Sequence, residues 1–121
     1  MNRPTAAMPC TDPRDVTRLE EAFDLTTPEI RQWELELIWA AVDRGLVKFP
    51  RHAARAAEDD AVPIKEILRV LRDGRARSKD VENMRKRQMG INFEGKIRGG
   101  RRIRAKVSWF RGYFVVTVHR L

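Results

Sequence analysis

The chain has 121 residues, which is enough for one domain with a modest hydrophobic core. Hydrophobic residues make up 42% of it and charged residues 35%, a balance that excludes wholesale disorder, and its longest apolar runs are too short to cross a membrane. With 25 Lys and Arg against 17 Asp and Glu, the net charge of +8 indicates a polyanionic partner, and nucleic acid is favoured over an anionic membrane surface.

The N-terminal tail is predicted to be mobile, because residues 1–11 show no periodicity. The tail contains the only cysteine, Cys10, so an internal disulfide and a cysteine-based zinc site are both excluded. The first residues also lack the apolar segment that is typical of a secretory signal. A cytoplasmic location is therefore predicted, with no membrane partner.

Helix start and stop signals divide the middle of the chain. Asp12-Pro13 and Thr27-Pro28 each place a capping side chain before a proline, which is a common way for a helix to begin, and Gly45 is a typical stop. Residues 12–45 are thus predicted to form a helical hairpin, in which Trp39 lies off the apolar stripe and covers another element or a partner. Helices are predicted at residues 12–24, 28–44, 51–59 and 63–74, with a short strand at 46–49.

Residues 75–90 form a polar, basic insert, either a loop or a marginal helix that begins at Ser78, and a solvated, partly mobile segment is favoured. Two interpretations of its cationic side chains stay open. They bind backbone phosphates and become ordered as they do so, or they only keep a linker soluble. These basic side chains are Arg75, Arg77, Lys79, Arg85, Lys86 and Arg87.

After Gly90 the spacing of apolar residues changes from helical to alternating, which predicts three strands joined as an antiparallel meander. Hairpin turns are predicted at Gly99-Gly100 and Arg111-Gly112. The second turn is predicted to pair Trp109 with Phe114, and the first hairpin to place Phe93 opposite Val107. The predicted fold class is α+β, with N-terminal helices packed on a small C-terminal antiparallel sheet, which contains the meander plus a short edge strand.

One face of this meander is predicted to be strongly basic. The expected register puts Lys96, Arg104 and His119 in one cross-strand row, and Glu94 beside Lys106 in the next. Like charges that face each other are destabilising, so the first row requires an anion, which a phosphate would supply. The alternative is a solvated face that holds only a Glu94–Lys106 ion pair. The side chains expected at the rim of this face are Arg98, Arg101, Arg102 and Arg120.

Short motifs after residue 45 resemble those of a large bacterial family of small domains of unknown function. The run His52-Ala53-Ala54-Arg55 matches its HA-x-x-R opening, and residues 67–74 match a helix that ends in I-x-x-x-L-x-x-G. Residues 93–95 and 115–118 match its aromatic-x-G strand and its V-V-T-V strand. The family is similar to the RelE/ParE-type toxin fold, in which two helices pack on a small antiparallel sheet. The resemblance covers residues 46–121 and leaves the 12–45 hairpin as an added extension.

The resemblance implies a metal-independent ribonuclease without a cofactor, in which Arg and Lys stabilise charge on the phosphate and a His, Tyr or Glu transfers the proton. His52, His119 and Arg104 are then the candidate catalytic residues, and Tyr113 is a candidate platform for base stacking. Structural alternatives stay open, because His119 also ends an exposed strand and His52 is also placed to fix its helix on the sheet. The other candidate nucleic-acid-binding residues are Lys96, Arg98, Arg101, Arg102, Lys106, Arg120 and Arg55.

Three functions stay open on the sequence. The first is a toxin-like protein that binds nucleic acid, RNA before DNA, whether or not it also acts as an endoribonuclease, with an acidic antitoxin or another protein as a second partner. The second is a non-catalytic binding protein of a phage or mobile element, which grips nucleic acid or the acidic surface of another protein. The third is a structural interaction module that uses the 12–45 hairpin.

Overall fold

The computed structural model describes residues 10–59, 61–82 and 89–121. Most of the predicted tail, and the part of the predicted basic insert that holds Arg85, Lys86 and Arg87, lie outside the described residues. In chain order the elements are η1 (Pro13–Asp15), α1 (Leu19–Ala22), α2 (Gln32–Asp43), β1 (Val47–Lys48), α3 (Arg51–Asp59), α4 (Ile64–Asp73), β2 (Arg75–Asp80), β3 (Gly90–Lys96), β4 (Arg102–Phe110) and β5 (Tyr113–Arg120). None of the described helices is long and apolar enough to cross a membrane.

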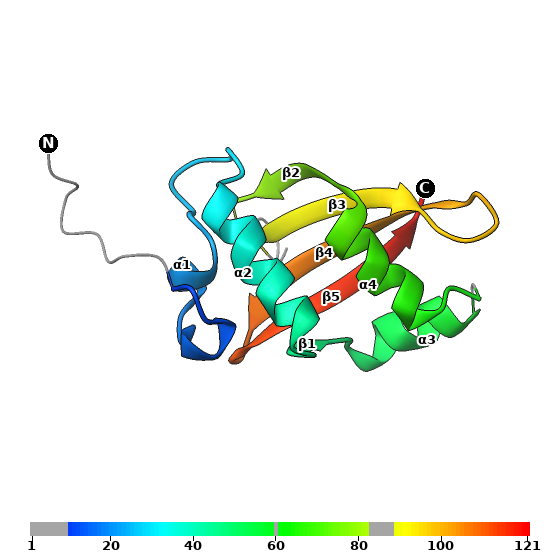
Figure 1. The fold of residues 1–121 in the computed structure, drawn as a ribbon, viewed down its shortest axis with the longest axis horizontal. Helices are drawn as coiled ribbons and strands as arrows, with labels where there is room; N and C mark the ends of the chain where they lie inside the picture. The colour runs from blue at the N-terminus through cyan, green and yellow to red at the C-terminus, as the bar shows by residue number, and fades with distance from the viewer. Residues whose placement is uncertain (1–9, 60, 83–88) are drawn as a thin grey trace, which may run out of the picture.

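The fold is α+β and contains one mixed sheet of five strands in the order β1-β5-β4-β3-β2. β1 runs parallel to β5, and the other neighbours are antiparallel. Helices α2 and α4 lie across one face of the sheet, and α3 lies beside the edge formed by β1 and β5 (Figure 1). The predicted α+β class is confirmed, and β3, β4 and β5 pair in succession with a short edge strand beside β5. The prediction of a small antiparallel sheet is wrong, because the sheet has five strands and β1 joins it in parallel.

Strand β2 is the element that the sequence pattern missed. Residues 75–80 pair with β3 along the second edge of the sheet, so the prediction of a solvated, partly mobile segment is wrong for them. The reason is that β2 shows no apolar alternation. Of its two side chains that face the helices, Ala76 is small and Lys79 is a cation, so the period-2 signal of a half-buried strand is missing.

Helices α3 and α4 lie where their start and stop signals predicted, whereas the N-terminal helices are shorter than expected. Two short pieces, η1 and α1, replace the single helix predicted at 12–24. The second helix begins at Gln32 rather than Pro28, because the Glu34 carboxylate accepts the backbone N–H of Arg31 at 2.6 Å and caps the helix there. Thr27 instead makes a local turn, in which its hydroxyl accepts the backbone N–H of Glu29 at 3.1 Å.

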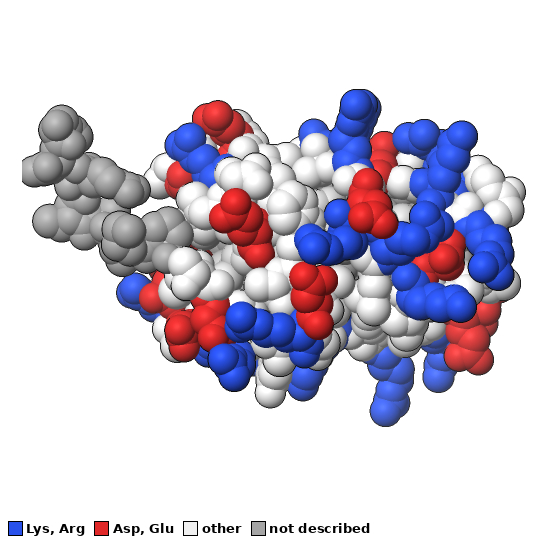
Figure 2. Space-filling view, viewed as in Figure 1, with Lys and Arg blue, Asp and Glu red and all other residues white. Residues whose placement is uncertain are grey.

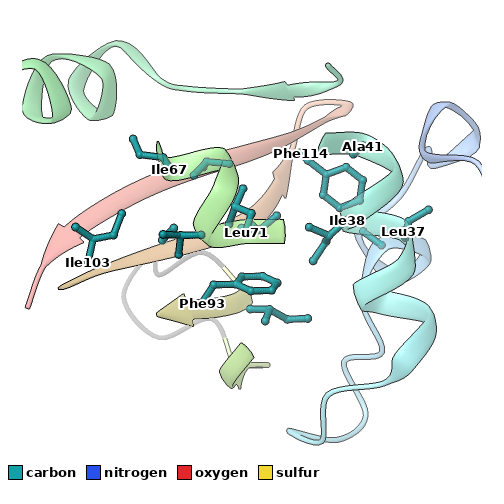
Figure 3. Close-up of a cluster of buried hydrophobic side chains, with 14 of the residues drawn as sticks. Leu37, Ile38, Ala41, Ile67, Leu71, Phe93, Ile103 and Phe114 are labelled. Carbon is teal, nitrogen blue, oxygen red and sulfur yellow. The ribbon is translucent and has the colours of Figure 1, made fainter. Parts of the chain in front are cut away.

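The hydrophobic core joins the 12–45 segment to the sheet. Side chains of α2, α4 and the sheet point into one cluster (Figure 3). Phe23 meets Phe114 of β5 edge to face, with ring centroids 6.2 Å apart. Trp39, which lies off the apolar stripe, covers α4 and donates its indole N–H to the carbonyl of Leu71 at 3.1 Å. The labelled core residues are Leu37, Ile38, Ala41, Ile67, Leu71, Phe93, Ile103 and Phe114.

A buried ion pair ties β2 to α2. The Nζ of Lys79 lies 3.0 and 2.9 Å from the two carboxylate oxygens of Glu34, and both side chains are fully buried. Lys79 also donates to the backbone carbonyl of Asp24 at 2.8 Å, so its ammonium is well satisfied. Glu34 additionally accepts the N–H of Asp24 at 2.8 Å. Lys79, which interrupts the apolar alternation of β2 in the sequence, thus links β2 to helix α2 through this ion pair.

The two hairpins differ in how well the sequence predicted their register. Between β4 and β5, Trp109 faces Phe114 as expected, and the turn residues Arg111 and Gly112 have φ angles of 53° and 90°, as a two-residue type I′ turn requires. Between β3 and β4, Phe93 faces Ala105 rather than Val107. The first loop has three residues, 98–100, since the Ile97 N–H donates to the carbonyl of Arg101 at 2.8 Å. The resulting two-residue shift keeps each side chain on its face but changes every cross-strand partner.

Candidate nucleic-acid interface

The face of the sheet that is turned away from α2 and α4, here called the far face, carries most of the predicted site residues. Its charged row is Arg75, Glu94, Arg104 and His119, each residue opposite the next across four neighbouring strands. The predicted row of Lys96, Arg104 and His119 is wrong, because the two-residue shift moves Lys96 opposite Arg102. Arg104 and His119 do lie opposite each other, as predicted.

Three arginines converge on Glu94 and form what we call the arginine cluster, Arg77, Arg102 and Arg104. Arg104 approaches one carboxylate oxygen of Glu94 with its Nη2 at 2.9 Å and its Nε at 3.2 Å. Arg102 and Arg77 approach the other oxygen at 3.6 and 3.7 Å. The hydrogen bond from Arg104, helped by the nearby guanidinium charges, holds the pKa of Glu94 below its usual value. The repulsion among the positive charges of this row is thus reduced by a carboxylate of the protein itself, Glu94.

The arginine cluster keeps a surplus of positive charge at the surface. A single carboxylate faces three guanidinium groups, whose side chains are 44–53% exposed. Each guanidinium has five N–H donors in a planar fork, so contact with one carboxylate leaves donors that can reach a phosphate. Lys96 lies directly opposite Arg102 and extends the cluster along the strands.

Lys106 is less suited to phosphate binding than the sequence suggested. The expected pair with Glu94 is wrong, and its Nζ instead lies 2.8 Å from the carboxylate of Asp80 on β2. Asp80 also accepts from the side-chain amide of Asn92 at 3.1 Å. The Lys106 side chain is only 14% exposed, so its charge is largely neutralised within the sheet.

A second surface lies at the other end of the sheet, where β4 turns into β5. Phe110 and Tyr113 flank the turn and are 50% and 47% exposed, although both are large hydrophobic residues. The Nζ of Lys48 lies 3.5 Å from the centre of the Tyr113 ring, and the guanidinium carbon of Arg111 lies 5.0 Å from the centre of the Phe110 ring. They line an open pocket of about 460 Å³, here called the aromatic pocket, together with Phe49, Pro50, His52 and Val115.

His52 is shared with a neighbouring pocket of about 440 Å³ on the surface of α3, here called the basic pocket. The basic pocket is lined by Arg51, His52, Arg55 and Asp59, so the two family-motif residues His52 and Arg55 lie on one side of their helix. Spacings of three and four residues place side chains on the same face of a helix, which explains the grouping.

The two candidate catalytic histidines are not brought together. His52 shares the aromatic pocket with Val115, and His119 lies four residues beyond Val115 on β5. At about 3.3 Å per residue of strand, the Cα atoms of Val115 and His119 are about 13 Å apart. Of the two histidines, only His119 is a cross-strand neighbour of Arg104, so any chemistry that a histidine and Arg104 share at one phosphate involves that pair.

Of the predicted rim residues, Arg102 belongs to the arginine cluster on the far face. The others lie on the other side of the sheet or belong to its end loop. The backbone N–H of Arg98 donates to Glu66 of α4 at 2.7 Å, and the Arg101 side chain donates to the carbonyl of Ala61 at 3.0 Å. Arg120 lies opposite Ile103, whose side chain belongs to the core face. Figure 2, viewed from the helix side, shows Lys and Arg gathered over this end of the molecule, with acidic side chains among them.

Sequence reasoning missed Lys48, Arg51, Phe110 and Arg111 as members of a site. The sequence did contain the information needed to find Phe110. The two-residue turn pairs Phe110 with Tyr113, and directly paired residues share one face of the sheet. Lys48 comes close to Tyr113 through the parallel pairing of β1 with β5, which local sequence does not reveal. Arg51 is the direct sequence neighbour of His52 on α3, so this member of the site was visible in the sequence.

Among the described residues, no group of three or more His, Cys, Asp or Glu side chains is arranged to hold a metal ion. A scan against protein-family models finds no match, and neither does a search of curated proteins or of solved structures.

Proposed function

We propose that the protein binds nucleic acid through the arginine cluster on the far face, and that single-stranded RNA is its preferred ligand. The observation that carries this proposal is the convergence of Arg77, Arg102 and Arg104 on the single carboxylate of Glu94. Glu94 holds the guanidinium groups in place, and the remaining positive charge faces solvent. Guanidinium groups held in this way bind the phosphate backbone with little further loss of side-chain freedom.

The wider fold supports a RelE/ParE-like version of this proposal. Within residues 46–121, helices α3 and α4 come before the β3-β4-β5 meander, and both pack against the sheet. A toxin-like protein of that kind would present its basic sheet face to RNA, and an acidic antitoxin would compete for the same face.

Binding through the arginine cluster predicts a steep dependence on salt. Affinity for a labelled single-stranded RNA of about ten nucleotides should fall between low and physiological salt, with a log–log slope of about −0.7 for each phosphate contacted. Arg104→Gln should weaken binding to all sequences and, by removing one phosphate contact, reduce the size of that slope by about 0.7. Arg104→Glu should weaken binding further. Fluorescence anisotropy over a salt series measures both effects.

The matched control is Lys65→Gln, which removes the same charge from an exposed position on α4, on the helix side of the sheet. It should leave the slope unchanged. Equal slopes for Arg104→Gln, Lys65→Gln and the unmodified protein would exclude the arginine cluster as the binding surface.

Cleavage of RNA is a second candidate function, and the observation that favours it is the position of His119 opposite Arg104. His119 would transfer a proton while Arg104 stabilises charge on the phosphate, and the 2′-OH of the RNA would be the nucleophile. Loss of a general acid or base typically lowers a rate by about 10²–10⁴-fold. His119→Ala should therefore abolish cleavage in a gel assay while RNA affinity persists. RNA that stays intact with the unmodified protein would leave binding alone as the function, and activity lost with a chelator would contradict a metal-independent reaction.

A further inference from the structure

We propose that the aromatic pocket and the basic pocket together bind one unpaired nucleotide, with its base in the aromatic pocket and its phosphate in the basic pocket. The two pockets share His52 in their linings, so they lie next to each other at the end of the sheet where β5 begins. This site goes beyond the proposed function, because none of its lining residues belongs to the arginine cluster. Phe110 and Arg104 are six residues apart on β4, which places their Cα atoms about 20 Å apart.

The aromatic pocket suits a base. Phe110 and Tyr113 lie opposite each other at the ends of β4 and β5, and about half of each side chain is exposed. The Lys48 ammonium over the Tyr113 ring occupies the surface on which a base would stack. A base stacked on an exposed ring interacts with it more strongly than a single cation does, because the base covers much more of the ring face. A base therefore displaces Lys48, whose flexible side chain leaves its charge close to the incoming phosphate.

The basic pocket suits a phosphate. Arg51 and Arg55 flank His52 there, and among the described residues Asp59 is the one acidic side chain in the lining. Lys48 and Arg111 add two positive charges at the rim of the aromatic pocket. The charge around the combined site is thus strongly positive, which favours an anionic occupant over an uncharged apolar side chain of a protein partner. Each pocket volume, about 440 and 460 Å³, lies in the range usual for small-molecule sites.

The experiment uses the full chain and three probes, namely adenosine 5′-monophosphate, adenosine and ribose 5-phosphate. Adenosine 5′-monophosphate carries both the base and the phosphate, and each of the other two lacks one of them. Isothermal titration calorimetry should show that adenosine 5′-monophosphate binds roughly tenfold or more tightly than either of the others, since each of them loses a whole set of contacts.

Two variants should separate the halves of the site in a crossed pattern. Tyr113→Leu keeps an apolar side chain but removes the ring, so it should weaken binding of adenosine 5′-monophosphate and adenosine by roughly tenfold and leave ribose 5-phosphate unchanged. Arg55→Gln should weaken adenosine 5′-monophosphate and ribose 5-phosphate and leave adenosine unchanged. Both side chains are exposed, so circular dichroism should report an unchanged fold, and Lys65→Gln is the matched control for the lost charge.

Absence of binding by adenosine 5′-monophosphate, or equal losses for all three probes in both variants, would overturn the proposal. Preference for a hydrophobic peptide that Tyr113→Leu does not weaken would also overturn it, since the pocket would then serve a protein partner. The outcome is independent of the proposed function. A crossed pattern supports the nucleotide site even if Arg104→Gln leaves the salt dependence of RNA binding unchanged.

Discussion

Replacing Lys79 with methionine is expected to lower the free energy of unfolding by about 3–5 kcal/mol. The substitution leaves the carboxylate of Glu34 buried without its cation, and the side chains of both partners have no exposure to water. Methionine has a similar length and apolar character, so the loss reflects an uncompensated charge rather than a cavity. Urea unfolding followed by circular dichroism measures the change.

The matched control is Lys65→Met, which makes the same replacement at an exposed position of α4 and should change stability by less than about 0.5 kcal/mol. Adding Glu34→Gln to Lys79→Met should recover part of the loss, because the unpaired charge is then gone. Recovery stays partial because Glu34 also accepts the backbone N–H groups of Asp24 and Arg31. A loss from Lys79→Met no larger than that of the control would contradict a structural role for the pair.

Removal of residues 1–45 is expected to prevent folding of the remaining chain. The deleted segment supplies Phe23, Leu37, Ile38 and Ala41, all buried at 0–1% exposure against α4 and the sheet. Burial of a large aliphatic or aromatic side chain contributes roughly 1.5–3 kcal/mol. The loss of Phe23, Leu37 and Ile38 therefore removes about 4.5–9 kcal/mol, which is comparable with the whole stability of a small domain, about 5–15 kcal/mol. Lys79 would also lose its partner. Near-UV circular dichroism and the dispersion of an amide NMR spectrum test whether residues 46–121 fold alone.

Cooperative unfolding and a dispersed spectrum for residues 46–121 would show that the RelE/ParE-like unit implied by the sequence motifs is an independent domain. In that case the 12–45 segment is an extension that packs on a finished fold, and the core contacts of α2 stabilise the extension more than they stabilise the sheet.

The parts of the fold that the sequence predicted are those set by local signals. Helices α3 and α4 follow a proline start and, for α4, a glycine stop, and the β4-β5 hairpin follows from a two-residue turn that leaves one possible register. The predicted β3-β4 register was wrong because a loop that contains Gly99 and Gly100 can close with more than one length. Both glycines have positive φ in the structure. Strand β2 was not predicted because its buried Lys79 is paired with Glu34, which lies 45 residues away in the sequence. No local sequence pattern contains such a contact.

For the candidate site too, the sequence placed correctly the residues that local signals determine and missed those that depend on long-range contacts. The Arg104–His119 pair lies within the hairpin of known register, so sequence alone placed it correctly. Glu94 was assigned to Lys106 because it sits across the hairpin whose loop was misjudged, and its role at the centre of the arginine cluster was missed. The aromatic pocket depends on β1 pairing with β5, a contact between segments about 65 residues apart, which alternation and capping rules do not encode. The described lining of the basic pocket, by contrast, comes from α3 alone.

The turn between β4 and β5 shows what the aromatic pocket costs the fold. Arg111 occupies a position of φ 53°, where an L-residue other than glycine, asparagine or aspartate is strained by roughly 1 kcal/mol. Asparagine would relieve that strain but would remove the guanidinium that lies beside the Phe110 ring. Selection for thermal stability alone would therefore replace Arg111. A redesign of this hairpin from turn statistics would do the same, and it would weaken the aromatic pocket although none of its rings had been changed.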